Sequence, residues 1–199
     1  MEKLKSTFRN MSLVLITVTV ITGALLAVVN HVTEEPIKVQ ADKVLSDGIK
    51  TVMRNNNIVV DSADSIVIDN DGRQDLFVVY RITGDGAGDV GKAIESSVMG
   101  FGGQMKILVG FDENSRILGY TILQSSETPG LGTKADKWFA EGGKGDITGH
   151  DMSDGKPLAV TKDGGTVDAI TASTITTRAF LKAVNQAYEV YEESRKSGD

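Results

Sequence analysis

The feature that most constrains this 199-residue chain is a stretch of nineteen uncharged residues, 11–29, dominated by Leu, Val, Ile and Thr. As a helix it would span about 28 Å, close to the roughly 30 Å hydrocarbon core of a bilayer. Cations precede the stretch at Lys3, Lys5 and Arg9, and a carboxylate follows it at Glu34. Under the positive-inside rule we expect the N-terminus in the cytoplasm and the rest of the chain across the membrane.

A cleaved signal peptide has the same charged start, but its apolar core is normally about 7–15 residues long and ends at a small-x-small site. The stretch here is longer and leads into Val-Val-Asn-His-Val at 28–32, a poor cleavage site. We therefore expect a cytoplasmic N-terminus and single-pass transmembrane anchor over residues 1–33. An extracytoplasmic domain would follow over residues 34–199, and the expected location is the inner (plasma) membrane.

Charge and composition exclude several classes of function. Because the chain carries −6 and its first ten residues carry +2, residues 34–199 carry −8, which argues against nucleic-acid binding. The absence of Cys excludes disulfides, iron–sulfur clusters, thiolate zinc and c-type haem. With two His residues, a multi-His metal site is excluded as well. We expect no metal, so any redox cofactor would be organic.

The pattern along the rest of the chain predicts an α+β fold. Pro36 is expected to break the first helix, and residues 58–116 have the β-branched and aromatic texture of strands. The other expected elements are a helix over 38–54, a hairpin with arms 105–111 and 117–123, a short helix over 133–140, strands at 158–160 and 167–170, and an amphipathic helix over 175–194. The sequence thus predicts a transmembrane helix followed by an antiparallel sheet with flanking helices.

Two apparent motifs do not have the context that their chemistry needs. Residues 86–91 match the dinucleotide fingerprint G-x-G-x-x-G, but the following residues offer too little helix before the next glycines, and Asp85 and Asp89 would repel a phosphate. We expect a loop between strands there. Ser153 and Lys156 have the S-x-x-K spacing of some acyl-transfer enzymes, without the partner motifs.

Hydroxyl residues crowd the segment before the last expected helix. Residues 168–177 read Asp-Ala-Ile-Thr-Ala-Ser-Thr-Ile-Thr-Thr. Free backbone N–H groups and the positive end of the helix dipole make a helix start a favourable place for a phosphate. A helix cap with threonine neighbours accounts for the same pattern. The segment indicates either a cap or the attachment point of a phosphate-containing cofactor.

Two glycine-rich loops lie upstream. Residues 127–132 read Glu-Thr-Pro-Gly-Leu-Gly, in which Pro129-Gly130 forces a turn and Gly130 and Gly132 leave backbone bare enough for a flat ring to approach. Residues 101–103, Phe-Gly-Gly, form a second bare loop with one aromatic side chain. Each loop alone is equally well an ordinary turn.

The order of the segments along the chain gives it a family resemblance. That order is the anchor, the Gly-Phe-Gly-Gly loop at 100–103, the hairpin, the 127–132 block, Asp163-Gly-Gly165 and the 168–174 segment. It resembles the FMN-binding G subunits of the Rnf complexes, which are ion-translocating ferredoxin:NAD oxidoreductases. The related C subunit of the sodium-pumping NADH:quinone oxidoreductase has the same plan. The resemblance covers essentially the whole chain.

The resemblance implies a covalent FMN. In that family the flavin is attached through its phosphate, by a separate flavin transferase, to the last hydroxyl of an Asp-x-x-(Ser/Thr)-Gly-Ala-(Thr/Ser) motif. Asp168 and Thr171 match this motif, and the acceptor falls on Thr174. Ala172 replaces the family's Gly and Ser173 replaces its Ala. If the glycine position needs a positive φ, Ala172 would be strained by about 1–2 kcal/mol.

The resemblance further implies an electron-transfer subunit with no catalytic residue of its own, working with the other membrane and redox subunits of its complex. The isoalloxazine is expected against residues 127–132, and Lys156 could offset flavin or phosphate charge. The expected cofactor-binding residues are Phe101, Gly102, Glu127, Thr128, Pro129, Gly130, Leu131, Gly132, Lys156, Asp168, Thr171, Ser173 and Thr174.

Three alternatives remain at this point. The chain could be a membrane-tethered assembly or ligand-binding module that has lost flavin, which Ala172 and Ser173 would favour. It could be the corresponding subunit of the sodium-translocating NADH:quinone oxidoreductase. It could also be a self-contained flavin reductase, although no acid/base or nicotinamide signature supports this.

Overall fold

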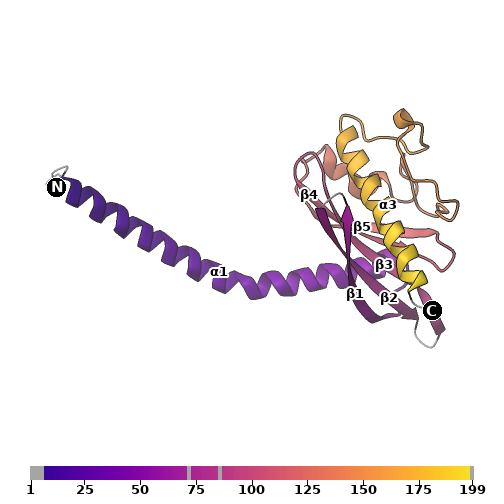
Figure 1. The fold of residues 1–199 in the computed structure, drawn as a ribbon, viewed down its shortest axis with the longest axis horizontal. Coiled ribbons are helices and arrows are strands. Elements are labelled where there is room, and N and C mark those ends of the chain that lie inside the picture. Colours follow the sequence, from indigo (N-terminus) through magenta and orange to yellow (C-terminus); the bar gives the residue numbers. More distant parts are fainter. Residues whose placement is uncertain (1–6, 71–72, 85–86, 198–199) are drawn as a thin grey trace. The chain divides into compact units, whose positions relative to one another are not determined.

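The uncharged stretch forms part of one long helix, α1 (Phe8–Val52). The computed structural model describes residues 7–70, 73–84 and 87–197 (Figure 1). The hydroxyls of Thr17, Thr19 and Thr22 each donate to the carbonyl four residues earlier at 2.8 Å, so these polar groups are satisfied within the helix. Among the described residues, α1 is the one helix long and apolar enough to cross a membrane. The chain therefore fits a single-pass membrane protein.

The expected break at Pro36 is wrong. Pro36 lies inside α1, which continues to Val52. Pro36 has no N–H to donate to the carbonyl of Val32, so one hydrogen bond of the helix is missing. Val32 and Pro36 both lie on an exposed part of the helix. An ion pair from Lys38 to Glu34, 2.7 Å long, spans the proline. The chain divides into two compact units between Val44 and Leu45, so the last turns of α1 belong to the second unit.

The sheet is a five-stranded antiparallel meander in the order β1-β2-β3-β4-β5, as the β texture predicted. Its strands are β1 (Ile58–Asn70), β2 (Arg73–Gly84), β3 (Ala87–Met99), β4 (Gln104–Phe111) and β5 (Ile117–Ser125). The predicted hairpin is confirmed as β4–β5. Its turn is held by Asp112, whose Oδ1 accepts hydrogen bonds from the N–H groups of Asn114 and Arg116 at 2.9 and 2.8 Å.

Helices cover both faces of this sheet. On one face, Ile49 and Val52 of α1 pack with Ile82 and Leu108 in a small apolar cluster. On the other face, the C-terminal helix α3 (Thr174–Lys196) packs across the strands, as Figure 1 shows. Its buried face includes Phe180 and Val184, as expected for an amphipathic helix whose apolar stripe meets a core. The predicted helix over 175–194 is confirmed.

The fingerprint-like glycines lie in a strand rather than in the expected loop. Gly91 belongs to β3, and with a φ of +140° its backbone approaches β4 so closely that a Cβ would stand 2.2 Å from the carbonyl oxygen of Phe111. Asp85 and Gly86, two of the positions on which that expectation rested, lie outside the described residues, and Asp89 belongs to β3. Gly91 is therefore needed for strand packing, not for holding a phosphate.

β2 and β3 pair over part of their length. Their register runs from Val78–Glu95 to Gly84–Ala87. Past Glu95, among the described residues, β3 pairs with β4 alone, while the start of β2 pairs with β1 alone. The sheet therefore opens at one end, next to the first turns of α3.

Between β5 and α3 the chain forms short elements and loops. These are η1 (Gly132–Lys134), α2 (Ala135–Trp138) and η2 (Thr161–Asp163), the first two of which confirm the predicted short helix over 133–140. The strands predicted at 158–160 and 167–170 are wrong, since the structure has one isolated bridge there, between Val160 and Val167. The bridge is parallel, and the turn between the two segments, with Gly164 at a φ of +84°, is much shorter than the crossover that parallel strands need.

Candidate functional site

The hydroxyl residues at the start of α3 differ in exposure and in their hydrogen bonds. Thr176 and Thr177 are buried, and their hydroxyls donate 3.0 Å hydrogen bonds to Glu127 Oε2 and to the carbonyl of Ser173. Ser173 is buried at the N-cap, whereas Thr174, the first helical residue, is partly exposed. Within the described part of the chain, no hydrogen bond of the Thr174 hydroxyl is found. Ser173 and Thr174 both line the pocket without a hydroxyl hydrogen bond to the described residues, and Thr174 is the more exposed of the two.

The backbone at this helix start is also available. Ser173 makes no side-chain capping bond to the described residues of α3, unlike a typical serine N-cap. The N–H of Thr177 is bonded to the carbonyl of Ser173 at 3.0 Å, which closes the first turn of the helix. The N–H groups ahead of it are the ones that a helix leaves without internal partners. The positive end of the helix dipole thus points to the position of Thr174.

Ala172 has a left-handed backbone, with a φ of +62°. The positive φ that the family's glycine suggested is confirmed, and the methyl group of Ala172 is strained by about 1–2 kcal/mol relative to a right-handed alanine. The left-handed backbone at Ala172 lets the chain turn into α3 shortly after Ile170. The N–H of Ile170 is bonded to the Thr177 hydroxyl at 3.0 Å. The strain lies two residues before Thr174.

Glu127 is the buried charge of the site, with 6% of its surface exposed. Its Oε1 accepts a hydrogen bond from the N–H of Phe101 at 2.7 Å, and its Oε2 accepts one from the hydroxyl of Thr176 at 3.0 Å. The carboxylate therefore joins three segments that are far apart in sequence: the loop between β3 and β4, the segment after β5, and the first turn of α3.

Glycines make room for this carboxylate. A Cβ on Gly100 would stand 1.9 Å from Glu127 Oε1, and one on Gly132 would stand 2.4 Å from Oε2. A Cβ on Gly102 would stand 2.4 Å from the carbonyl of Ser126. At these three positions the space beside the backbone is filled by Glu127 or by the Ser126 carbonyl. Gly130 differs, because nothing lies within 4 Å of its Cβ position and its φ is +74°, as a Pro-Gly turn requires.

These segments enclose a pocket of about 290 Å³. It is lined by Phe101, Glu127, Thr128, Leu131, Gly132, Ala172, Ser173, Thr174, Ile175 and Thr176. The wall combines exposed apolar side chains, including Phe101, Leu131 and Ile175, with the hydroxyl residues of the helix start. The structure thus brings together the two glycine-rich loops and the hydroxyl segment at one pocket. Ile175, Thr176 and Ala172 were not singled out from the sequence as binding residues, although their spacing from Thr174 could have suggested them.

Other expected binding residues lie outside this lining. The carbonyl of Asp168 accepts a hydrogen bond from Trp138 Nε1 at 2.8 Å, so its backbone anchors α2. Thr171 is exposed, and the exposed Lys156 forms a 3.2 Å ion pair with Asp154. Gly102, Pro129 and Gly130 belong to the flanking loops and do not line the pocket.

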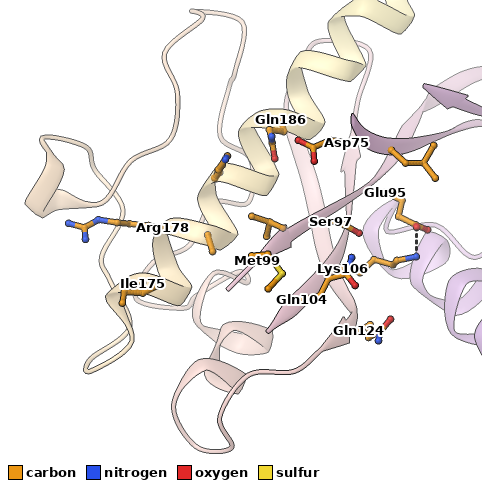
Figure 2. Close-up of a pocket in the computed structure, with 14 residues that line it drawn as sticks. Asp75, Glu95, Ser97, Met99, Gln104, Lys106, Gln124, Ile175, Arg178 and Gln186 are labelled. Carbon is orange, nitrogen blue, oxygen red and sulfur yellow. Dashed lines mark ion pairs between the residues drawn. The ribbon is translucent and has the colours of Figure 1, made fainter. Parts of the chain in front are cut away.

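A second, larger cavity of about 680 Å³ opens where β2 and β3 separate, and Figure 2 shows its lining. Glu95 and Lys106 form an ion pair of 2.7 Å on its sheet side. Burial, together with the nearby Glu95 carboxylate, raises the pKa of Tyr80 to about 12. Ile175 lines both cavities, so the two adjoin at the first turn of α3.

These features define the class of protein. A family model described as the FMN-binding domain matches residues 100–189, which include both glycine-rich loops and α3 up to Glu189. The chain is thus an FMN-binding-domain protein with one candidate transmembrane helix.

Curated relatives narrow the class. The chain is 32% identical over 185 residues to the G subunit of the ion-translocating oxidoreductase complex of Vibrio vulnificus, covering 88% of this chain and 85% of the relative. It is 35% identical over 178 residues to the corresponding G subunit of Yersinia pestis, covering 82% and 80% of the two chains. With the G subunit of Aliivibrio fischeri it shares 33% identity over 199 residues, covering 94% and 91%.

The chain belongs to the G-subunit (RnfG) family of the ion-translocating oxidoreductase complexes. It is a redox-complex subunit that carries an FMN-binding domain.

Proposed function

We propose that this subunit transfers electrons through an FMN held by a phosphoester on Thr174, in a complex that couples ferredoxin:NAD electron transfer to ion translocation. The observation that carries the proposal is the hydroxyl of Thr174, which lines the pocket at the start of α3 while its neighbours Thr176 and Thr177 are buried and hydrogen-bonded. Bound FMN supplies reversible one- and two-electron chemistry to such a subunit.

The pocket fits the two ends of FMN chemically. A phosphoester on Thr174 would place negative charge at the N-terminus of α3, beside N–H groups without helical partners, which is the favourable end of the helix dipole. The exposed apolar side chains of Phe101, Leu131 and Ile175 would hold the flat ring. A pocket of about 290 Å³ lies at the lower limit of ordinary ligand sites, so part of the flavin would remain accessible to partner subunits.

Attachment requires an activated donor, because direct condensation of an alcohol with FMN releases water and is unfavourable in water. We propose that the Thr174 oxygen forms a bond to the FMN phosphorus of a flavin dinucleotide. The phosphoanhydride bond to the nucleoside monophosphate breaks, that monophosphate leaves, and the hydroxyl proton is released. A separate flavin transferase would catalyse this step, in which no electron is transferred.

The membrane arrangement is a further part of the proposal. Lys3, Lys5 and Arg9 precede the uncharged stretch and Glu34 follows it, which favours a cytoplasmic N-terminus. Residues 1–33 would then form the N-terminus and anchor in the inner membrane, and residues 34–199 the extracytoplasmic FMN domain. A covalent bond would retain FMN on a side of the membrane that has no free flavin pool.

The test is co-expression of the full chain with a flavin transferase, followed by intact mass measurement and in-gel flavin fluorescence after denaturation. The wild type should gain the mass of one FMN moiety, and Thr174→Ala should lose both signals. Thr161→Ala, at an exposed threonine outside the pocket lining, is a matched control and should keep the flavin. Ser173→Ala should also keep it. A Thr174→Ala chain that stays flavinylated, or a colourless wild type, contradicts the proposal; the latter result favours a flavin-free module.

A further inference from the structure

The buried carboxylate of Glu127 occupies the junction of the pocket walls. Its two oxygens accept from Phe101 N and Thr176 Oγ1, at 2.7 and 3.0 Å, and these donors come from two different walls. Removing a buried carboxylate from water is unfavourable unless hydrogen bonds compensate it. Here each oxygen has such a bond, so Glu127 is engaged with the protein itself.

Two glycines flank the Glu127 carboxylate and leave room for it. A Cβ added to Gly100 would stand 1.9 Å from Glu127 Oε1, and one added to Gly132 would stand 2.4 Å from Oε2, so the carboxylate occupies the space that a methyl group would need. Two separate segments thus lack side chains on the two sides of one carboxylate. Small residues at such positions permit close approach of another group, and that group is Glu127.

This contact links the first turn of α3 to a distant segment. The Ser173 side chain makes no capping bond to the described helix residues, and the Thr177 hydroxyl ties the turn to Ile170 and Ser173 of the same segment. Thr176 is the third residue of the helix, and its hydroxyl bond to Glu127 fixes the turn against the segment after β5. Thr174 lies two residues earlier on that turn and lines the same pocket.

We infer that Glu127 is a positioning residue: it holds the first turn of α3 and the Phe101 loop so that the Thr174 hydroxyl faces the pocket. This inference rests on the proposed attachment of FMN to Thr174. Glu127 acts through Thr176 and Phe101 and does not itself need to touch the flavin. The geometry of the two bonds, rather than the negative charge, is the property that matters.

The Gln variant separates geometry from charge. In Glu127→Gln the amide oxygen can accept from Phe101 N–H and the amide nitrogen can donate to the Thr176 oxygen, so both links survive without the charge. Glu127→Ala removes both links. Gly132→Ala keeps the carboxylate but displaces it, since the added Cβ would stand 2.4 Å from Oε2. Thr176→Val removes one link and leaves the charge in place.

The experiment measures kcat and KM for flavin attachment to the purified full chain in detergent, with the flavin transferase and a flavin dinucleotide. Because a misplacement of about 1 Å costs roughly 100-fold in a reaction that depends on orientation, Glu127→Ala and Gly132→Ala should each lower kcat at least about tenfold, with little change in KM for the chain. Glu127→Gln should stay within about threefold of wild type. Thr176→Val should fall between them, and adding it to Glu127→Ala should lower kcat no further.

Amide hydrogen exchange in the flavin-free chain gives a readout that needs no flavin. Exchange at Phe101 N–H should accelerate at least about tenfold in Glu127→Ala and Gly132→Ala, and it should be nearly normal in Glu127→Gln. The N–H of Ile117, bonded to the carbonyl of His150 at 3.0 Å outside this loop, is the internal control and should not change. Glu189→Ala, an exposed carboxylate on α3, is the matched control for both measurements.

The outcomes are distinguishable. An equal loss of kcat in Glu127→Gln and Glu127→Ala would show that the charge matters and would overturn the inference. Wild-type kcat and wild-type exchange at Phe101 N–H in Glu127→Ala and Gly132→Ala would overturn it as well. A wild type that accepts no flavin contradicts the proposed function instead. In that case the exchange arm still decides whether Glu127 holds the Phe101 loop.

Discussion

Arg178 donates from Nε and Nη2 to the two carboxylate oxygens of Asp163, each at 2.7 Å. This bidentate pair fastens the η2 loop to α3 one turn after Thr174. Both side chains are about half exposed, so the pair is screened by solvent and contributes modestly to stability. The Arg178 guanidinium holds the pKa of Asp163 below its ordinary value.

The Asp163–Arg178 pair should make stability depend on pH. Because the folded-state pKa of Asp163 is lowered, its contribution is present above the ordinary Asp value of about 4 and is lost as the pH falls through the folded value. The free energy of unfolding of Asp163→Asn should therefore lie below that of wild type near neutral pH and converge with it in acid. Urea titrations at several pH values, followed by the fluorescence of Trp138, the single tryptophan, would measure this. In an Arg178→Gln background the difference should vanish at every pH; its persistence would remove Arg178 as the cause.

Ala172→Gly should stabilise the chain. The substitution relieves a positive φ of +62°, and after the greater unfolded-state entropy of glycine is counted we expect a gain of about 0.5–1 kcal/mol. The same urea titrations would measure it. Ala183→Gly, in the buried middle of α3, is the control and should destabilise by about 1 kcal/mol or more. A loss of stability in Ala172→Gly would mean that residue 172 does not have this backbone in solution.

Gly91→Ala should destabilise the fold far more than alanine at a glycine with open space around it. The new methyl would stand 2.2 Å from the Phe111 carbonyl and the φ is +140°, so we expect a loss of about 2–5 kcal/mol. Gly142→Ala has a φ of +76° with nothing within 4 Å of its Cβ position, and it should lose about 1–2 kcal/mol. Similar losses at both sites would contradict the close contact between β3 and β4.

Tyr80 should ionise only in strongly alkaline solution. Its pKa of about 12 arises first from burial and then from Glu95, so Glu95→Gln should lower it while leaving it above the ordinary value of about 10. Because the folded value exceeds the unfolded one, stability should fall as the pH rises from about 10 to about 12. Phenolate absorbance, with the Tyr80→Phe titration subtracted, would give the pKa. Glu141→Gln, at an exposed carboxylate paired with Arg54, should not change it.

The position of the flavin ring can be tested by quenching. If Phe101 and Leu131 hold the ring, Phe101→Ala and Leu131→Ala should keep the covalent flavin but increase its quenching by iodide about twofold or more, since each substitution removes apolar cover. Leu76→Ala alters the larger cavity alone and should leave quenching unchanged. A larger effect from Leu76→Ala would place the ring in that cavity instead.

Much of the fold could be predicted from local patterns. The uncharged stretch, the Asp112 turn between two β-rich arms and the apolar stripe of the last helix each depend on nearby residues, and the structure has all three. The break expected at Pro36 is absent because an exposed helix tolerates a missing hydrogen bond. Residues 158–160 and 167–170 look like strands in composition, but a tight turn leaves them a single bridge.

The site was harder to predict because its key contacts join distant segments. The sequence indicated that residues 127–132 and the 168–174 segment matter, but it could not show that Glu127 reaches Phe101 and Thr176. Nor could it show that Gly132 is bare to admit a carboxylate. Glycine-rich spacing alone does not reveal which group fills the space.

The crowding around the Glu127 carboxylate implies that the residues tolerated at positions 100, 127 and 132 depend on one another. While the acid is present, a methyl group on Gly100 or Gly132 would stand 1.9 or 2.4 Å from its oxygens, so the carboxylate would have to shift. Once the acid is shortened, the contact at Gly100 is relieved, whereas a Cβ on Gly132 would still stand 2.8 Å from the Cβ of residue 127. Alanine is therefore easier to accommodate at position 100 after the glutamate has changed than before, while position 132 stays restricted to glycine.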